Sequence, residues 1–266
     1  MTAQDTQAKA LQRIRADVRS MHGYHVQPSQ GLLKMDTMEN PYRLPTDLQR
    51  ALGERLGGLE INRYPGERLE VLKKMLSDYA GAPAGSAVLL GNGSDEIITL
   101  LALATAMPTQ EGRAKMLAPM PGFVMYPLSA QLQGLDFVSV NLTADFELDV
   151  PAMQAAIAEH QPAITYIAYP NNPTATLWPE DQVQAIIDAV GAIGGLVIMD
   201  EAYQPFASRS WITRMKAEPA RNGHVLLMRT LSKFGLAGAR LGYLIGPSAI
   251  VNELDKVRPP YNISVL

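Results

Sequence analysis

The sequence predicts an α/β protein with a mostly parallel central sheet. From about residue 67 onward, short apolar runs alternate with longer segments of helical periodicity, which is the pattern of strands joined by helices. Turn residues such as Gly, Pro and Asn separate the two kinds of segment. Ligands of such sheets bind beyond the carboxyl ends of the strands, so the loops that follow the strands are the expected place of a functional site.

The N-terminal 66 residues are predicted to lie outside this alternation. Residues 1–20 are predicted to form a polar helix, with Leu11, Ile14 and Val18 on one side. Residues 21–66 are rich in Gly, Pro and turn residues, which indicates an extended arm rather than a core element. The arm contains several tyrosines, whereas disordered tails are poor in aromatic residues. We therefore expect a helix and an arm over residues 1–66 and a large domain over residues 67–266.

The apolar runs of the large domain predict seven strands, over residues 87–90, 115–118, 137–140, 164–168, 196–199, 225–228 and 241–245. Helices are predicted over about residues 67–80, 94–107, 121–133, 151–160 and 179–190, and after Pro247.

The composition narrows the possible functions. The net charge is −3, with 23 Lys and Arg against 26 Asp and Glu, so no basic excess indicates a nucleic-acid partner. The chain has no cysteine, which excludes disulfides and thiolate metal sites. The first 20 residues lack the apolar core of a secretory signal, and the longest apolar stretch, residues 97–107, is far shorter than a membrane span. We expect a cytoplasmic protein that binds small molecules, with no metal and no membrane partner.

The strand-end loops carry polar groups of different types. In the first loop, GNGSDE, the glycines and the start of a helix could cradle a phosphate, although taken alone Ser94 is more simply an ordinary N-cap. The Asn-Pro sequence at Asn172 is usually just a turn. Asp200 ends an apolar run and needs a partner, which a structural ion pair would also provide. Lys233 follows another apolar strand and can simply reach solvent.

Taken together, the loops resemble those of the aspartate-aminotransferase-like, fold type I enzymes, which use pyridoxal 5′-phosphate. YPNNPTAT, MDEAYQPF and RTLSKFGLAGARLGY follow one another in the order of that family. The resemblance to histidinol-phosphate aminotransferases is closer still, and adds MENPYRLP, INRYPG, GNGSDEII and RPPYNISVL. It covers nearly the whole chain from about Tyr24 onward. It implies the aspartate-aminotransferase-like fold, pyridoxal 5′-phosphate as cofactor, and a homodimer.

The resemblance implies a chemical role for several residues. Lys233 matches the lysine that binds the cofactor covalently and moves a proton at the substrate α-carbon. Asp200 matches the acid that pairs with the pyridine nitrogen of the cofactor. Tyr203 and Asn172 match hydrogen-bond partners of the ring oxygen, and Asn172 also matches a residue beside the substrate.

Further matches concern the cofactor phosphate and ring. Arg240 and Ser232 match phosphate ligands, and the backbone N–H groups of Ser94 and Asp95 would add to them. Arg240 follows Lys233 by seven residues, where many relatives have eight.

Three aromatic residues complete the predicted site. Phe123 matches the aromatic residue that stacks on the ring, although a core position would also suit it. Tyr64 matches a tyrosine that reaches the cofactor of the neighbouring subunit, and Tyr24 resembles an arm residue near the substrate.

The implied reaction is transamination of L-histidinol phosphate with 2-oxoglutarate, giving imidazole-acetol phosphate and glutamate, in histidine biosynthesis. A related enzyme that uses the same cofactor, such as an aromatic aminotransferase or a phosphothreonine decarboxylase, is the alternative, as is a non-catalytic cofactor-binding fragment. The chain stops at Leu266, where family members continue into a C-terminal small domain. We therefore expect that domain to be absent and turnover by these 266 residues to be weak.

Overall fold

The computed structural model describes residues 3–23, 28–110 and 112–266, which divide into two compact units, Met1–Met38 and Glu39–Leu266. The first unit contains α1 (Ala3–Leu11) and α2 (Ala16–Ser20). The predicted single helix over residues 1–20 is therefore wrong, because Arg15 adopts an extended conformation, with ψ of 137°, between the two helices. Nothing in the structure tests the predicted domain boundary between residues 66 and 67.

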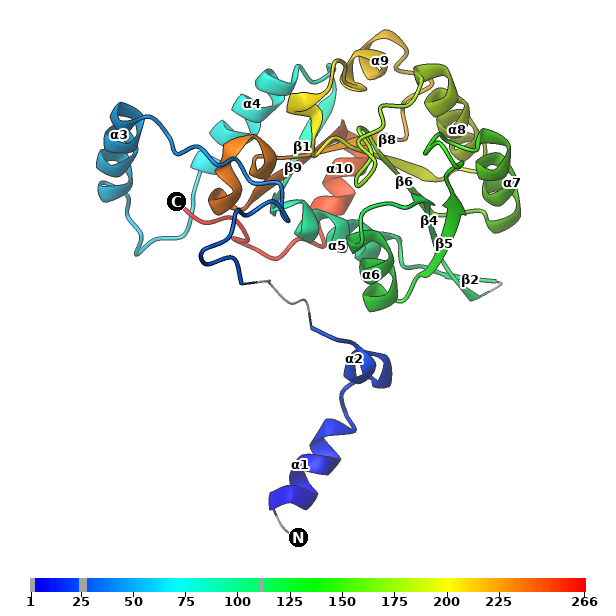
Figure 1. Ribbon diagram of the computed structural model, residues 1–266, viewed down its shortest axis with the longest axis horizontal. Helices are drawn as coiled ribbons and strands as arrows, with labels where there is room; N and C mark the ends of the chain where they lie inside the picture. The colour runs from blue at the N-terminus through cyan, green and yellow to red at the C-terminus, as the bar shows by residue number, and fades with distance from the viewer. Residues whose placement is uncertain (1–2, 24–27, 111) are drawn as a thin grey trace. The chain divides into compact units, whose positions relative to one another are not determined.

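The second unit is built on a seven-stranded sheet, in which all seven predicted strands are present (Figure 1). The strands run in the spatial order β1-β9-β8-β7-β6-β4-β5. Their bounds are β1 Ser86–Asn92, β4 Lys115–Met120, β5 Asp136–Asn141, β6 Ile164–Ala168, β7 Leu196–Asp200, β8 Val225–Thr230 and β9 Leu241–Pro247. The strands from β4 to β8 are parallel, and only β9 is antiparallel to its neighbours β1 and β8. The predicted mostly parallel α/β sheet is confirmed.

Helices cover both faces of the sheet (Figure 1). Side chains of α4 (Arg68–Ala80), α7 (Val150–His160), α8 (Glu180–Ala192) and α9 (Ile212–Ala217) share one apolar core with strand residues. Those of α5 (Ser94–Thr105), α6 (Met125–Gln133) and α10 (Ser248–Asp255) share the other. Along β8, for example, Leu227 points to the first core and Leu226 to the second. Burial on both faces explains why the strands are continuous apolar runs in the sequence.

Some elements differ from the sequence prediction. The arm contains the helix α3 (Thr46–Gly57), which has no buried residue and which the surrounding Gly and Pro residues obscured. The predicted helix over residues 121–133 begins only at Met125. Residues 121–124 precede it as a non-helical segment. The backbone packs closely there, since a Cβ on Gly122 would lie 2.7 Å from the Pro119 carbonyl oxygen. The short strands β2 (Pro108–Thr109) and β3 (Gly112–Arg113) pair with each other, and neither these strands nor α9 were predicted. In the part of the chain that the structure describes, no helix is long and apolar enough to cross a membrane.

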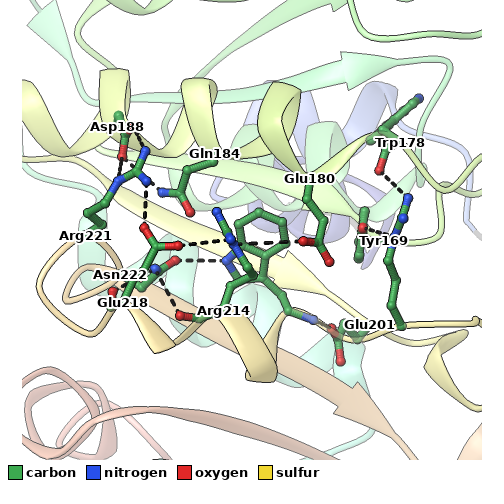
Figure 2. Close-up of polar contacts among 12 residues, drawn as sticks. Tyr169, Trp178, Glu180, Gln184, Asp188, Glu201, Arg214, Glu218, Arg221 and Asn222 are labelled. Carbon is green, nitrogen blue, oxygen red and sulfur yellow. Dashed lines mark hydrogen bonds and ion pairs between the residues drawn. The ribbon is translucent and has the colours of Figure 1, made fainter. Parts of the chain in front are cut away.

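A polar network joins α8 to α9 and to the turn before β8 (Figure 2). Arg221 pairs with Asp188 of α8 and with Glu218, and Glu218 also pairs with Arg214 of α9. Below this exposed layer, the indole N–H of the buried Trp211 donates to the Asn222 amide oxygen at 2.9 Å. The network anchors the far end of the β7–β8 connection, whose near end follows Asp200 and carries Tyr203.

Candidate active site

One edge of the sheet collects the loops that the sequence singled out. In the register of the parallel strands, Ala168 at the end of β6 lies beside Asp200 at the end of β7. Thr230 at the end of β8 lies beside Gly242, near the start of the antiparallel β9, and Asn92 at the end of β1 lies beside Leu241. The segments that follow β1, β6, β7 and β8, and the segment that precedes β9, therefore meet at the same edge.

Asp200 is a buried carboxylate held at both oxygens. The residue is only 5% exposed. Its Oδ2 accepts a hydrogen bond of 2.6 Å from the Tyr126 hydroxyl. Oδ1 accepts one of 3.0 Å from the Ala202 backbone N–H. Burial raises the pKa of Asp200, while these two hydrogen bonds and the nearby Lys233 ammonium oppose the rise. A cationic group beside Asp200 would therefore be strongly favoured, because it would stabilise the buried carboxylate.

Lys233 is half-buried and lies in the same neighbourhood. Its Nζ is 5.6 Å from the centre of the Tyr203 ring. Burial lowers the pKa of Lys233; nearby Arg240 lowers it too, while the carboxylates of Asp95, Glu39 and Asp200 oppose the change. An amine of lowered basicity is a better nucleophile and proton carrier near neutral pH.

The backbone around Lys233 is unusual. Residues Ser232–Leu236 form a wide helical turn, in which Gly235 has φ of +133°. This conformation favours glycine, and a Cβ there would also lie 3.0 Å from the side-chain nitrogen of Asn40. The Asn40 amide donates to the Phe234 carbonyl at 3.2 Å. The NPY segment of the arm thus supports the lysine loop.

The start of α5 and Arg240 form an anion cradle. Gly93 is the N-cap of α5, with φ of +80° and ψ of +170°, so the interpretation of Ser94 as the N-cap is wrong and Ser94 is the first helical residue. No N-cap side chain competes for the N–H groups of the first turn, which carry the positive end of the helix dipole. A Cβ on Gly93 would lie 2.5 Å from Nη2 of Arg240, so the guanidinium sits directly against this turn. Nη2 is also 3.8 Å from Oδ2 of Asp95.

Glycine lets the cradle close. A Cβ on Gly242 of β9 would lie 2.6 Å from the Ser94 nitrogen, so only glycine allows β9 to pass this close to the start of α5. Glu96 fixes the turn from the other side by accepting hydrogen bonds from the Asn92 backbone N–H at 2.7 Å and from the Asn262 amide at 2.6 Å. Ser232 is buried beside this region and is hydrogen-bonded to the Thr230 hydroxyl at 2.9 Å.

The remaining predicted residues lie around this centre. Asn172 is half-buried, while its neighbour Asn171 donates to the Pro121 carbonyl at 3.1 Å and so ties the loop after β6 to the turn that carries Phe123. Phe123 is half-buried, packs on the core beneath α6, and meets the Tyr126 ring edge-to-face at 5.7 Å. Phe123 therefore buries part of its surface in the core and leaves the rest exposed.

Of the two arm tyrosines predicted to belong to the site, Tyr64 lies in the part of the chain that the structure describes. Tyr64 is 75% exposed, and its ring stacks on that of Tyr261 at 4.4 Å. Tyr24 lies outside the described residues.

Sequence reasoning missed three residues that support the site. Tyr126 is hidden in a helix pattern that predicts core, and Asn40 belongs to a turn-rich arm. Glu201 directly follows Asp200, and a second acid at the end of an apolar strand could have been questioned for its partner. That partner is the buried Arg229, whose Nε donates to Oε2 at 3.0 Å.

The arrangement fits pyridoxal 5′-phosphate, the cofactor that the resemblance implies. The buried, hydrogen-bonded Asp200 suits a protonated ring nitrogen, and the half-buried Lys233 of lowered pKa suits an aldehyde. The cradle at Gly93, which a Cβ would fill against Arg240, suits a phosphate dianion.

Comparison with known proteins identifies the family. Residues 31–266 match the family model of aminotransferase class I and II. The histidinol-phosphate aminotransferase of Paracidovorax citrulli (strain AAC00-1) is 72% identical over 98% of this chain and 71% of its own length. That of Acidovorax sp. (strain JS42) is 70% identical over the whole chain and again 71% of its own length. The chain thus spans about 71% of the length of these relatives.

Solved structures agree on the fold. The histidinol-phosphate aminotransferase of Sinorhizobium meliloti in complex with pyridoxal-5′-phosphate aligns with a TM-score of 0.76 at 23% identity, over 95% of this chain and 68% of that one. The enzyme from Clostridium acetobutylicum aligns with a TM-score of 0.73 at 23% identity, over 86% and 65%. The predicted fold and the predicted cofactor, pyridoxal 5′-phosphate, are confirmed. The chain belongs to the class I and II aminotransferases and, within them, to the histidinol-phosphate aminotransferases.

Proposed function

We propose that the protein transfers the amino group of L-histidinol phosphate to 2-oxoglutarate, giving imidazole-acetol phosphate and glutamate in histidine biosynthesis. The observation that carries the proposal is that Asp200, Lys233 and the Arg240 cradle meet at one sheet edge, in a chain about 70% identical to proteins of that name. We place it in the cytoplasm and expect a homodimer, in which Tyr64 of each chain reaches the cofactor phosphate of the other.

When bound, pyridoxal 5′-phosphate supplies an electron sink that weakens the bond between the substrate α-carbon and its proton. Lys233 would hold the aldehyde end of the cofactor through Nζ, and the same nitrogen would move the proton at the substrate α-carbon. The lowered pKa of Lys233 leaves a larger fraction of its amine unprotonated near neutral pH, as both tasks require.

The other residues hold and tune the ring. Asp200 would pair with the ring nitrogen and keep it protonated, while Tyr203 and Asn172 would donate hydrogen bonds to the ring oxygen. Phe123 would pack on the ring face. Asn172 also lies beside the substrate, and we assign Tyr24 to the substrate as well.

The phosphate end fixes the position of the cofactor. Arg240 offers two parallel N–H donors, Ser232 a hydroxyl, and Ser94 and Asp95 the N–H groups of the helix start. Because the cradle holds one end and Asp200 the other, Lys233 meets a fixed target.

The first experiment is to titrate the purified chain with pyridoxal 5′-phosphate and to record the absorbance spectrum before and after borohydride. We expect a visible band that borohydride fixes covalently onto Lys233, located by peptide mass spectrometry. Lys233→Ala should lack the band, whereas Lys256→Ala, which removes an exposed lysine paired with Glu253 on α10, should keep it. A folded wild-type chain without the band would refute the cofactor assignment.

The substrate is tested by the half-reaction, which needs no second substrate. Adding L-histidinol phosphate to the loaded chain should convert the band of the lysine-bound cofactor into that of its amine form. Phenylalanine and phosphothreonine should do so at least tenfold less efficiently, since a site that binds a polar group rejects analogues that lack it. Faster conversion by phenylalanine would favour an aromatic aminotransferase. Release of CO₂ from phosphothreonine without formation of the amine form would favour a phosphothreonine decarboxylase.

A further inference from the structure

We propose that Tyr126 is a positioning residue that sets the proton affinity of Asp200, so that the proton shared with the cofactor resides on the ring nitrogen. The inference rests on the role proposed above for Asp200. It concerns a residue of α6 that lies 74 positions away from Asp200 in the sequence.

The geometry allows one direction of hydrogen bonding. The Tyr126 hydroxyl lies 2.6 Å from Oδ2 of Asp200, and an ionised carboxylate can only accept, so the phenol donates. With the Ala202 N–H on Oδ1 at 3.0 Å, each carboxylate oxygen carries one donor from the protein. The orientation of the carboxylate is thereby fixed by two unrelated elements, α6 and the loop after β7.

The phenol itself has little freedom to move. Tyr126 is 1% exposed, and its ring stacks on that of Tyr166 of β6 at 4.3 Å with an interplanar angle of 21°. The ring of Phe123 meets it edge-to-face at 5.7 Å. Burial raises the pKa of Tyr126 well above its usual value, and Asp200 adds to the rise, so the hydroxyl keeps its proton and stays a donor.

Burial favours the neutral form of Asp200. Burial raises the pKa of this carboxyl, and of the groups that oppose the rise the Tyr126 hydrogen bond is the strongest, ahead of the Ala202 N–H and the Lys233 ammonium. Asp95 acts in the same direction as burial. The remaining titratable groups that face this carboxylate are the phenols of Tyr166 and Tyr203, which stay neutral because burial raises their pKa values as well.

Tyr166 supplies a matched control. It is fully buried and stacked on Tyr126, yet its hydroxyl has no hydrogen-bond partner among the described residues. Tyr126→Phe and Tyr166→Phe each remove one buried hydroxyl from the same aromatic stack. Only the first removes a donor to Asp200.

The experiment loads the wild-type chain and both variants with pyridoxal 5′-phosphate carrying ¹⁵N in the ring, and records the nitrogen chemical shift and the dissociation constant. We expect a protonated ring nitrogen in wild type and in Tyr166→Phe. In Tyr126→Phe the shift should move toward that of neutral pyridine, with roughly ten- to hundredfold weaker binding, the range for a hydrogen bond to a charged group. A protonated nitrogen and unchanged affinity in Tyr126→Phe would overturn the inference.

Two further outcomes must be distinguished from a failure of the role proposed for Tyr126. A neutral ring nitrogen in the wild-type chain would refute the proposed role of Asp200 rather than that of Tyr126. If Tyr126→Phe does not fold, trifluorotyrosine at position 126 keeps both ring and hydroxyl but donates more strongly. The ring nitrogen must then stay protonated to a higher pH than in the wild-type chain, and an unchanged pH dependence of the shift would count against Tyr126.

Discussion

Asp200 shows at the scale of one residue how function and stability oppose each other. The residue is 5% exposed, and burial raises its pKa. A carboxyl whose pKa is higher in the folded than in the unfolded chain destabilises the fold once it ionises. The loss begins as the pH rises through the ordinary value of 3.8 and is complete above the raised value. Until a cationic ring nitrogen is bound, the cofactor-free protein carries this cost.

Asp200→Asn should therefore stabilise the cofactor-free chain by on the order of 1 kcal/mol at neutral pH, because the amide has no charge to desolvate. Tyr126 can still donate to its oxygen. The advantage over wild type should grow as the pH rises above the ordinary value of 3.8 and level off once Asp200 is ionised in the folded chain, as measured by urea denaturation. An advantage independent of pH would contradict the argument. The variant should also bind pyridoxal 5′-phosphate more weakly.

Gly93 is the second position where one residue decides the chemistry. Its backbone conformation is open essentially to glycine alone, and a Cβ would displace Arg240. Gly93→Ala should cost about 1–3 kcal/mol of stability from strain, and should weaken binding of the cofactor phosphate more than tenfold.

Gly85→Ala is the control for strain alone, since Gly85 has φ of +79° and nothing lies within 4 Å of an added Cβ. It should lose stability without losing cofactor affinity, as measured by thermal unfolding and by titration of the visible band. Equal losses of affinity in the two variants would remove the special role of the cradle.

At the scale of elements, a buried ion pair links the loop after β7 to β8. Glu201 has a fully buried side chain and accepts from Arg229, whose side chain is 7% exposed, at 2.9 Å from Nη2. The same carboxylate accepts from the Trp211 backbone N–H at 2.6 Å, so it also holds the start of α9. The strand that leads to Lys233 and the loop that carries Tyr203 are thereby fixed to each other.

Arg229→Met should destabilise the chain by about 3–5 kcal/mol, because it leaves Glu201 buried without its countercharge. Adding Glu201→Gln should restore part of the loss, which identifies the unpaired charge as its cause. As a control, breaking the exposed pair between Lys256 and Glu253 by Lys256→Met should change stability by less than about 1 kcal/mol. The measurement is urea unfolding of the three variants and the wild-type chain, and no recovery in the double variant would contradict this account.

At the scale of the whole molecule, the question is whether one chain completes its own site. Tyr64 is exposed and stacks on Tyr261. The neighbouring Asn262 amide donates to Glu96 at the phosphate turn. The C-terminal segment thus links the base of the Tyr64 stack to the cradle, while the Tyr64 ring faces solvent.

Subunit exchange tests the proposed dimer. Tyr64→Phe keeps the ring stack but removes the hydroxyl, and should weaken cofactor binding about tenfold. In a mixture with Lys233→Ala, each mixed dimer contains one site with Lys233 from one chain and Tyr64 from the other. Borohydride-fixed cofactor at low pyridoxal 5′-phosphate should therefore recover on mixing. If binding in the mixture equals that of Tyr64→Phe alone, Tyr64 acts within its own chain.

The sequence by itself determined the elements and the chemistry of the loops. All seven strands followed from apolar runs, since a strand buried on both faces needs apolar residues throughout. The polar residues at strand ends marked the site, because the carboxyl ends of parallel strands share one edge. The helix α3 was missed because Gly and Pro residues surround it, and α6 was predicted to begin at residue 121 although it begins at Met125.

The tertiary structure alone decided which side chains meet. The strand order β1-β9-β8-β7-β6-β4-β5 brings Arg240 against Gly93, and α6 places Tyr126 on Asp200. The sequence favoured Ser94 as the N-cap of α5, whereas the backbone angles place the N-cap at Gly93. Local patterns encode periodicity and turn chemistry, but a contact across 74 residues depends on how crossovers order the strands, and no local pattern contains that order.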